Sequence, residues 1–362
     1  MATEKKNYWL IFFSALFIGY TFLASELIPD ETVFAYQWIT SLETGRLEEN
    51  AQAADTQLPS EPVPFEIGNR FGYVDWSGSF FINKEKKANV YLSPNLFSEY
   101  DGRPDTITVA DYTGKTVLEL EQPNGYPFFL DNTVFLLNSE QCSISRLDEE
   151  GNVLWTRDFA APITCADAAA GILVVGLLDG TAEIIGVDGE RLYFSEPSGS
   201  RIAAVYGCAI SPTGTAIALV RGLDVQRFIY IEQFGSAWRV THHEFLEDGM
   251  RRQVYVMFTH EGRRVIFERE DGIGIYDAEK RQSSRVQLNG KVVAMEREGG
   301  NELLLLVTQD TDLKNRFIAI QYPETILIEA PFESKNVSLA RNGNFILTGS
   351  DGKLAAFRIE RK

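Results

Sequence analysis

The sequence has few of the residues that build metal centres and redox sites. It contains three histidines and three cysteines, Cys142, Cys165 and Cys208, which stand 23 and 43 residues apart. No two cysteines form a CxxC pair and no histidine stands in an HExxH motif, so we expect neither a zinc site nor a dense disulfide framework. The sequence leaves one alternative, a single Cys142–Cys165 disulfide between neighbouring strands. The sequence therefore predicts no bound metal.

Basic residues are also scarce. The 362 residues include 34 Lys and Arg against 51 Asp and Glu, which gives a formal net charge of −17. Nucleic-acid binding needs clustered basic residues, so nucleic acid is excluded as a partner. Hydrophobic residues make up 44% and aromatic residues 12%, which indicates a large folded core, and four Met against 29 Gly and 13 Pro favour strands joined by turns.

An uncharged apolar run occupies residues 8–24, after Lys6 and before Glu26. By the positive-inside rule, residues 1–7 stay in the cytoplasm and the chain after Ala24 is translocated. A run of 17 residues is short for a membrane-spanning helix and long for a signal-peptide core, so both remain open. Its aromatic content and the lack of a small-x-small cleavage site favour an uncleaved transmembrane helix, and no cysteine near Ala24 offers a lipid-attachment site.

The following segment, residues 25–64, predicts an acidic stalk with eight acidic residues and Arg46 as its one base. Phe34, Trp38 and Leu42 recur every four residues, which predicts a short amphipathic helix. The apolar stripe of this helix either packs on the folded body, or rests on the membrane or on a second copy. The small, polar, Pro-containing residues that follow predict a flexible tether of about 15 residues.

From residue 65 onward one phrase recurs: an alternating strand, a turn with Asp and Gly, and a second strand. Gly78, Gly114, Gly151 and Gly189 mark its first four copies at intervals of 36, 37 and 38 residues. Glycine supplies the positive φ of a tight turn and Asp accepts hydrogen bonds from the turn backbone, so each phrase predicts a hairpin. Later copies are degenerate and stand about 45 residues apart, within the range of four-stranded propeller blades.

These phrases resemble the β-propeller superfamily, in particular its WD40-like and quinoprotein-like families. Asn152–Trp155 matches the quinoprotein phrase Gly-x-Val-x-Trp, and Ser211–Gly214 is similar to the WD40-like Ser-Pro-Asp-Gly turn. The resemblance implies an all-β propeller of four-stranded antiparallel blades over residues 65–362. Seven blades are preferred and eight are possible, because eight outer-strand phrases stand against seven inner pairs. We expect Arg70–Asp75 to complete the blade that Lys353–Ile359 begins, so that the ends of the domain meet.

The motifs of propeller enzymes are missing. Quinoprotein dehydrogenases need a vicinal disulfide and an acidic calcium loop, and this chain has no adjacent cysteines and no DxDxDG motif. Asp179-Gly180, Asp188-Gly189 and Asp351-Gly352 predict turns. There is no GxSxG elbow, Walker loop or histidine relay. The sequence therefore predicts a protein with no catalytic residues and no cofactor.

Charge is uneven along the chain. Residues 221–291 carry 12 basic and 11 acidic residues, whereas the rest of the chain carries 22 basic and 40 acidic residues. The basic residues of this sector either pair with their acidic neighbours or form a recognition surface for an acidic partner, which its histidines would make pH-sensitive. Asn124–Phe129 offers a second candidate, in which aromatic side chains project from a loop. The candidate interaction residues are His242, His243, Arg251, Arg252, His260, Arg263, Arg264, Tyr126 and Phe128.

Together these features predict a non-catalytic propeller on the extracytoplasmic, periplasmic side of the inner membrane, anchored by residues 8–24. The predicted role is that of a scaffold for protein partners of the cell envelope, because propellers with the quinoprotein-like phrase include scaffold lipoproteins of outer-membrane assembly. This chain departs from them in lacking the lipid-attachment cysteine. The alternatives are a propeller that binds a ligand in its central channel, or a degenerate propeller enzyme.

Overall fold

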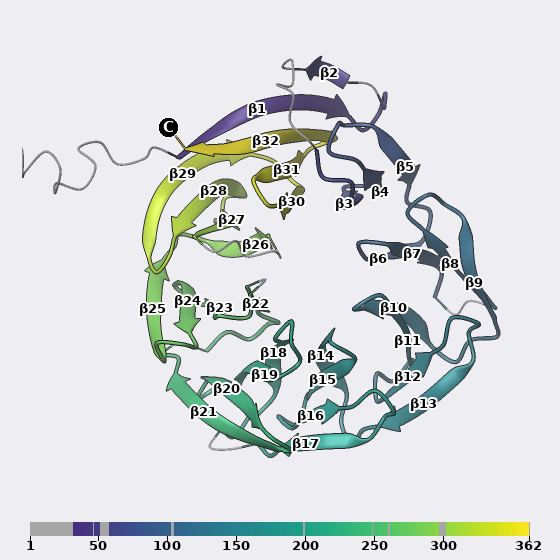
Figure 1. The fold of residues 1–362 in the computed structure, drawn as a ribbon, viewed down its shortest axis with the longest axis vertical. Coiled ribbons are helices and arrows are strands. Elements are labelled where there is room, and N and C mark those ends of the chain that lie inside the picture. Colours follow the sequence, from purple (N-terminus) through teal and green to yellow (C-terminus); the bar gives the residue numbers. More distant parts are fainter. Residues whose placement is uncertain are drawn as a thin grey trace, which may run out of the picture.

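Eight antiparallel sheets follow one another around a central axis and form a closed ring, as shown by a computed structural model (Figure 1). The structure describes residues 32–45, 47–50, 58–102, 105–197, 200–247, 249–259, 261–296 and 302–361. All the regular elements within these ranges are strands. The predicted all-β propeller of antiparallel blades is thereby confirmed.

Each sheet is one blade, and we number the blades in chain order from the first innermost strand, β3. Blade 1 consists of β3 (Val63–Ile67), β4 (Arg70–Val74) and β5 (Phe80–Glu85). Blade 2 consists of β6 (Asn89–Leu92), β7 (Leu96–Tyr100), β8 (Thr106–Asp111) and β9 (Thr116–Glu121). Blade 3 consists of β10 (Tyr126–Leu130), β11 (Thr133–Leu137), β12 (Ser143–Leu147) and β13 (Val153–Asp158). Blade 4 consists of β14 (Ile163–Ala169), β15 (Ile172–Leu177), β16 (Ala182–Ile185) and β17 (Arg191–Ser195).

The second half of the ring repeats this order. Blade 5 consists of β18 (Val205–Ile210), β19 (Ala216–Arg221), β20 (Arg227–Phe234) and β21 (Ala237–Phe245). Blade 6 consists of β22 (Val256–Phe258), β23 (Arg264–Arg269), β24 (Gly272–Asp277) and β25 (Gln282–Gln287). Blade 7 consists of β26 (Lys291–Met295), β27 (Leu303–Gln309), β28 (Lys314–Gln321) and β29 (Thr325–Glu333). Blade 8 consists of β30 (Val337–Asn342), β31 (Phe345–Ser350), β32 (Lys353–Arg361), β1 (Thr32–Ser41) and β2 (Leu47–Asn50).

Blade 8 closes the ring by joining the two ends of the described chain. β1 pairs with β32 over its whole length, from Thr32 opposite Arg361 to Ser41 opposite Lys353 (Figure 1). The predicted meeting of the domain's ends is therefore confirmed, but the predicted closing strand was wrong. Residues 70–74 form β4, which pairs with β3 and β5 in a sheet of their own.

The same strand corrects the predicted stalk helix. Residues 32–41 are rich in aromatic and β-branched residues, and they form a strand with a bulge between Tyr36 and Trp38. The bulge reverses which side of the sheet the following side chains face. Phe34 therefore packs towards blade 7, whereas Trp38 and Leu42 pack into the core between blades 8 and 1. The strand buries the apolar stripe on both sides of blade 8.

The ring has eight blades, so the preferred number of seven was wrong. Blade 1 has three strands and the outer strand of blade 8 lies before residue 65, so a count of strand pairs within 65–362 falls one blade short. The predicted tail 1–7 and membrane helix 8–24 lie outside the described residues, as do residues 51–57 of the predicted tether. Within the described ranges, no helix combines the length and hydrophobicity that crossing a membrane requires.

The predicted Asp-Gly turns are present. Gly78, Gly114 and Gly151 have φ values of 88°, 87° and 88°. In each turn the preceding Asp carboxylate accepts hydrogen bonds from backbone N–H groups; the Asp111 carboxylate, for example, accepts from the amide of Thr113 at 2.9 Å. The hydroxyl of Thr113, first among several donors, lowers the pKa of Asp111. Gly189 has a φ of 80°, but there the Glu190 carboxylate accepts the turn hydrogen bond in place of Asp188.

The two faces of the ring differ in their connections. One face, which we call the loop face, carries the connections from each outer strand to the next blade, including residues 200–204 and 249–255. It also carries the turns between second and third strands, and these turns form hydrogen bonds with the connecting loops. In blade 5, for example, Leu246 N donates to Gln226 O at 2.8 Å. The turns between first and second strands and between third and fourth strands lie on the opposite face. Sites on this scaffold are therefore assigned to one face or the other.

Candidate interaction surface

The structure does not gather the predicted basic residues into one surface. Arg251 and Arg252 lie in the loop before β22, on the loop face, whereas Arg263 and Arg264 lie at the turn between β22 and β23. β22 and β23 pair antiparallel with Phe258 opposite Val265, so this turn lies at the far end of β22 from the loop. His260 lies outside the described residues.

Arg252 forms an ion pair with a buried carboxylate. Its guanidinium donates to both carboxylate oxygens of Glu268, Nη1 to Oε2 at 3.0 Å and Nη2 to Oε1 at 2.5 Å. The side chain of Glu268 is only 1% exposed and also accepts the backbone N–H groups of Tyr255 at 3.3 Å and Val292 at 3.2 Å. The hydrogen bond to Glu268 raises the pKa of Arg252. Because Val292 belongs to blade 7, this pair joins blades 6 and 7.

Arg263 and Arg264 are also paired. Arg263 Nε lies 3.2 Å from Glu279 Oε2 and 3.4 Å from Asp277 Oδ2, and Arg264 Nε lies 3.9 Å from the same Asp277 oxygen. The Arg264 guanidinium also lies 4.4 Å from the centre of the Tyr322 ring of blade 7, a cation–π contact. The paired alternative describes these arginines.

The two described histidines differ in environment. His242 stacks on Tyr276 with ring centres 4.4 Å apart at 17°, and burial lowers its pKa, so it gains charge only below the usual range of histidine. His243 is exposed on β21 and lies edge-on to Phe245 at 6.2 Å. Of these two described histidines, His243 is therefore the one that is exposed to solvent.

Tyr126 and Phe128 lie on β10 and not in a projecting loop, so that alternative was wrong for them. Phe128 stacks on Phe135 with ring centres 5.3 Å apart at 22°, within the core of blades 3 and 4. The Tyr126 hydroxyl donates to Gly102 O at 2.6 Å. Both side chains serve blade packing.

Three loops on the loop face pack side by side, at residues 200–204, 222–226 and 246–255 without residue 248. Leu223 N donates to Ile202 O at 2.9 Å, which joins the first two loops. The buried amide of Gln226 donates to Met250 O at 3.2 Å and accepts from Met250 N at 3.3 Å, which joins the second to the third. Together they form one continuous support.

Exposed arginine, aromatic and aliphatic side chains lie on these loops and at the adjoining end of β21. The side chain of Arg201 is 93% exposed, and Ile202, Phe245 and Tyr255 are 54%, 57% and 41% exposed. Arg251 is also exposed, and it forms no ion pair with another residue of the described ranges. Arginine and aromatic residues are enriched at the centres of protein interfaces. We call this set of five residues the three-loop surface.

Sequence reasoning found Arg251 of this surface and missed the other four residues. The signal for Arg201 and Ile202 was weak: they follow a Gly- and Ser-containing stretch between two strands, which indicates a longer loop. Nothing local in the sequence says that this loop contacts residues 246–255. Among the described residues, no group of three or more His, Cys, Asp or Glu side chains is placed to hold a metal ion.

Asp224 fastens the first two loops together. Its carboxylate accepts hydrogen bonds from the hydroxyl of Ser200 and from the backbone N–H of Arg201 at 3.1 Å, and it lies 3.3 Å from Arg201 Nε. The Ser200 hydroxyl makes the largest contribution to lowering the pKa of Asp224 to about 2. The carboxylate thereby fixes the backbone that presents Arg201 and Ile202.

We expect Ser200→Ala to raise the pKa of Asp224 from about 2 towards its ordinary value of 3.8. Because the folded pKa is depressed, the carboxylate stabilises the loops fully above pH 3.8, and this contribution disappears as the pH falls towards about 2. An NMR titration of the Asp224 carboxyl carbon measures both. Ser200→Thr keeps a hydroxyl and should leave the midpoint low; an unchanged midpoint in Ser200→Ala would contradict the assignment.

Comparison with known proteins places the chain among propellers. A family model described as beta-propeller protein matches residues 1–362. An uncharacterized protein of Treponema pallidum (strain Nichols) is 26% identical over 360 residues, covering 98% of this chain and 95% of its own length.

Solved structures share the fold at low identity. BamB from Moraxella catarrhalis superimposes with a TM-score of 0.56 at 11% identity, covering 90% of this chain and 100% of its own. A chain of the Mitotic Checkpoint Complex gives 0.55 at 14% identity, with coverages of 86% and 95%. The computationally designed protein Ika8 gives 0.57 at 15% identity, with coverages of 83% and 98%. At these identities the likeness is one of fold alone.

Proposed function

Because the chain belongs to the beta-propeller protein family, whose model matches its whole length, we propose that it is a non-catalytic platform that binds an acidic protein partner through the three-loop surface. The exposure of Arg201 and Arg251 beside Ile202, Phe245 and Tyr255 is the observation that carries the proposal. Apolar contacts there would supply affinity, and the arginines would supply bidentate contacts to carboxylates. A rigid ring suits this role because its loops vary without disturbing the blades.

The charge distribution supports an acidic partner. The sector 221–291 is close to neutral, whereas the rest of the chain carries 40 acidic and 22 basic residues. An acidic protein would be repelled by most of this molecule and admitted at the loops of blades 5 and 6. Such repulsion elsewhere favours one mode of docking. One of the structural neighbours is a chain of the Mitotic Checkpoint Complex, which gives a precedent for this fold within a protein assembly.

We expect the double variant Arg201→Glu, Arg251→Glu to reduce capture of the partner at least tenfold, about 1.4 kcal/mol of binding free energy. Reversing both charges places like charges against an acidic surface. Quantitative crosslinking of the full chain in its native membranes, followed by mass spectrometry, measures the captured protein.

The matched control is Arg239→Glu, Lys280→Glu, which makes the same change of charge at exposed positions towards the opposite face. It should leave capture unchanged. If both double variants captured the partner as well as the unaltered chain does, the three-loop surface would have no role in binding. If both lost capture to the same extent, the effect would come from net charge alone.

We further propose that residues 8–24 anchor the propeller in the inner membrane, with the ring on the extracytoplasmic side. The support is the uncharged run, the lysines before it and the acidic residues after it. The sequence resemblance to scaffold lipoproteins of outer-membrane assembly adds a role in envelope assembly to this proposal.

Leu16→Arg, Ile18→Arg should release the full chain from membranes washed with alkaline carbonate. Each arginine near the centre of a spanning helix costs about 2.5–3.5 kcal/mol. Leu16→Ile, Ile18→Leu is the control and should stay in the pellet. Retention of the arginine variant would contradict an anchor at these residues. Protection of the ring from protease added to cells stripped of any outer membrane would contradict its extracytoplasmic placement.

A further inference from the structure

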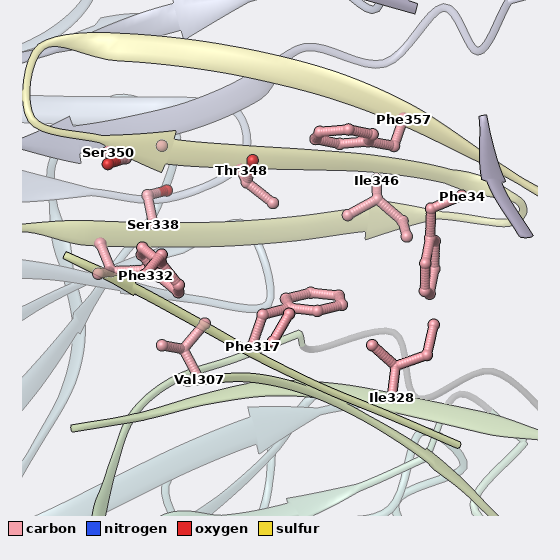
Figure 2. A pocket seen from close by; sticks show the side chains of 13 residues that line it. Phe34, Val307, Phe317, Ile328, Phe332, Ser338, Ile346, Thr348, Ser350 and Phe357 are labelled. Atoms are coloured by element: carbon pink, nitrogen blue, oxygen red, sulfur yellow. The ribbon is translucent and has the colours of Figure 1, made fainter. Parts of the chain in front are cut away.

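An apolar slot lies between blades 7 and 8. It has a volume of about 310 Å³, and Phe317, Ile328 and Phe332 of blade 7 face Phe34 and Phe357 of blade 8 across it (Figure 2). Phe34 and Phe317 meet edge to face with ring centres 5.6 Å apart. The slot is therefore walled by large apolar side chains that remain only partly buried.

The slot lies where blade 8 has a smaller side chain than the five blades before it have at the same position. The fourth residue of the second strand faces the preceding blade and is a buried aliphatic or aromatic residue in blades 3 to 7: Leu136, Val175, Leu219, Phe267 and Leu306. Blade 8 has Thr348 at this position, opposite Ala355 on the neighbouring strand. Phe267 fills the equivalent space in blade 6 by stacking on Phe228 at 4.1 Å. In blade 8 the corresponding space, beside Thr348, is open.

The slot has polar groups at one end. Figure 2 shows Ile346, Thr348 and Ser350 in a row along β31, with Ser338 beside Ser350 at one end and Phe34 at the other. The row spans about 13 Å, since a strand rises about 3.3 Å per residue. Neither the Ser338 nor the Ser350 hydroxyl has a hydrogen-bond partner within the described part of the chain. None of the lining residues is charged.

We propose that this slot binds the aliphatic chain of a single-chain lipid whose end group is uncharged and forms hydrogen bonds. The elongated apolar walls match an extended chain, and the hydroxyls of Ser338 and Ser350 match an alcohol or ester at its end. A slot without a charged residue, in a protein of net charge −17, favours a neutral ligand. Small-molecule sites have this make-up of apolar walls and a few placed polar groups.

The source of the ligand rests on the proposed anchor, although the binding itself does not. β1 begins eight residues after the end of the apolar run 8–24. Eight residues of fully extended chain span at most about 30 Å. Phe34, on this first part of β1, forms one end of the slot. A ring anchored by that run would therefore hold the slot within reach of membrane lipids.

The test is photocrosslinking of the purified full chain, kept soluble in a steroid detergent without linear chains, to a 12-carbon alcohol that carries a diazirine on its chain. We expect labelling of peptides from β28, β29 and β31, and competition by unlabelled dodecanol. Thr348→Leu places in blade 8 the side chain found in blades 3, 5 and 7, and should reduce labelling at least tenfold. It should not lower the melting temperature, because it fills a cavity.

Thr325→Leu is the matched control, since it makes the same substitution on the exposed start of β29. The probe should label this variant to the same extent as the unaltered chain. Undiminished labelling of folded Thr348→Leu, or labelling spread over all blades, would overturn the proposal. Ala330→Leu fills the slot from blade 7 and repeats the test should Thr348→Leu fail to fold. The soluble probe makes the result independent of whether residues 8–24 cross a membrane.

Discussion

Trp38→Ala should lower the free energy of unfolding by about 3–5 kcal/mol, the range for removing a large buried aromatic side chain. Trp38 is 3% exposed and packs with Phe65, Leu347 and Leu354 between blades 8 and 1. Its indole Nε1 also donates to Trp76 O at 2.8 Å, so the substitution leaves that buried carbonyl without its donor. The side chain lies where the two ends of the chain close the ring, and its loss loosens both blades at once.

Urea denaturation of the full chain, followed by circular dichroism, measures the change. Trp38→Phe keeps most of the buried area and loses the hydrogen bond, so it should cost about 1–3 kcal/mol. Phe81→Ala removes an aromatic side chain that is 43% exposed on blade 1 and should cost less than about 1 kcal/mol. If Trp38→Ala proved no more harmful than Phe81→Ala, β1 would not be the strand that closes the ring.

The turns could be predicted from the sequence because their causes are local. A glycine with positive φ and an Asp that accepts from its own turn lie within four residues of each other, as at Asp111 and Gly114. The closing strand could not be predicted in this way. A spacing of four residues suits a helix and also one side of a strand, and only the partner β32, more than 300 residues away, decides between them. The bulge after Tyr36 then separates Phe34 from Trp38.

The candidate site shows the same division between local and distant causes. The sequence located arginines in residues 221–291, but the strand register assigns their partners. Arg252 meets Glu268, and Arg263 meets Asp277, because hairpins bring residues 14 to 16 positions apart together. The three-loop surface depends on contacts between loops of two different blades, such as that of Gln226 with Met250. The charge distribution located the arginines, and the topology decides which of them stay exposed.

Substitution by alanine should therefore affect the free energy of unfolding strongly at Arg252 and hardly at all at its neighbour Arg251. Arg252→Ala leaves the buried carboxylate of Glu268 without its counter-ion, and removing one partner of a buried ion pair typically costs 3–5 kcal/mol. The Arg252 side chain is 42% exposed, so water partly replaces it and we expect about 3 kcal/mol. Arg251→Ala alters an exposed side chain and should change stability by less than about 0.5 kcal/mol.

A double variant separates this charge effect from lost packing. Arg252→Met, Glu268→Leu removes both charges together, so no buried carboxylate is left without a counter-ion. It should recover part of the stability that Arg252→Ala loses, and not all of it, because the backbone N–H groups of Tyr255 and Val292 lose the acceptor that Glu268 gives them. Urea denaturation of the three variants measures the recovery, while crosslinking under native conditions measures their capture of the partner. Arg251→Ala should weaken capture without affecting stability, and the double variant should keep capture near the unaltered level. Equal stability of Arg252→Ala and the unaltered chain would mean that Glu268 is reached by solvent, and Arg252 would then rejoin the exposed arginines of the loop face.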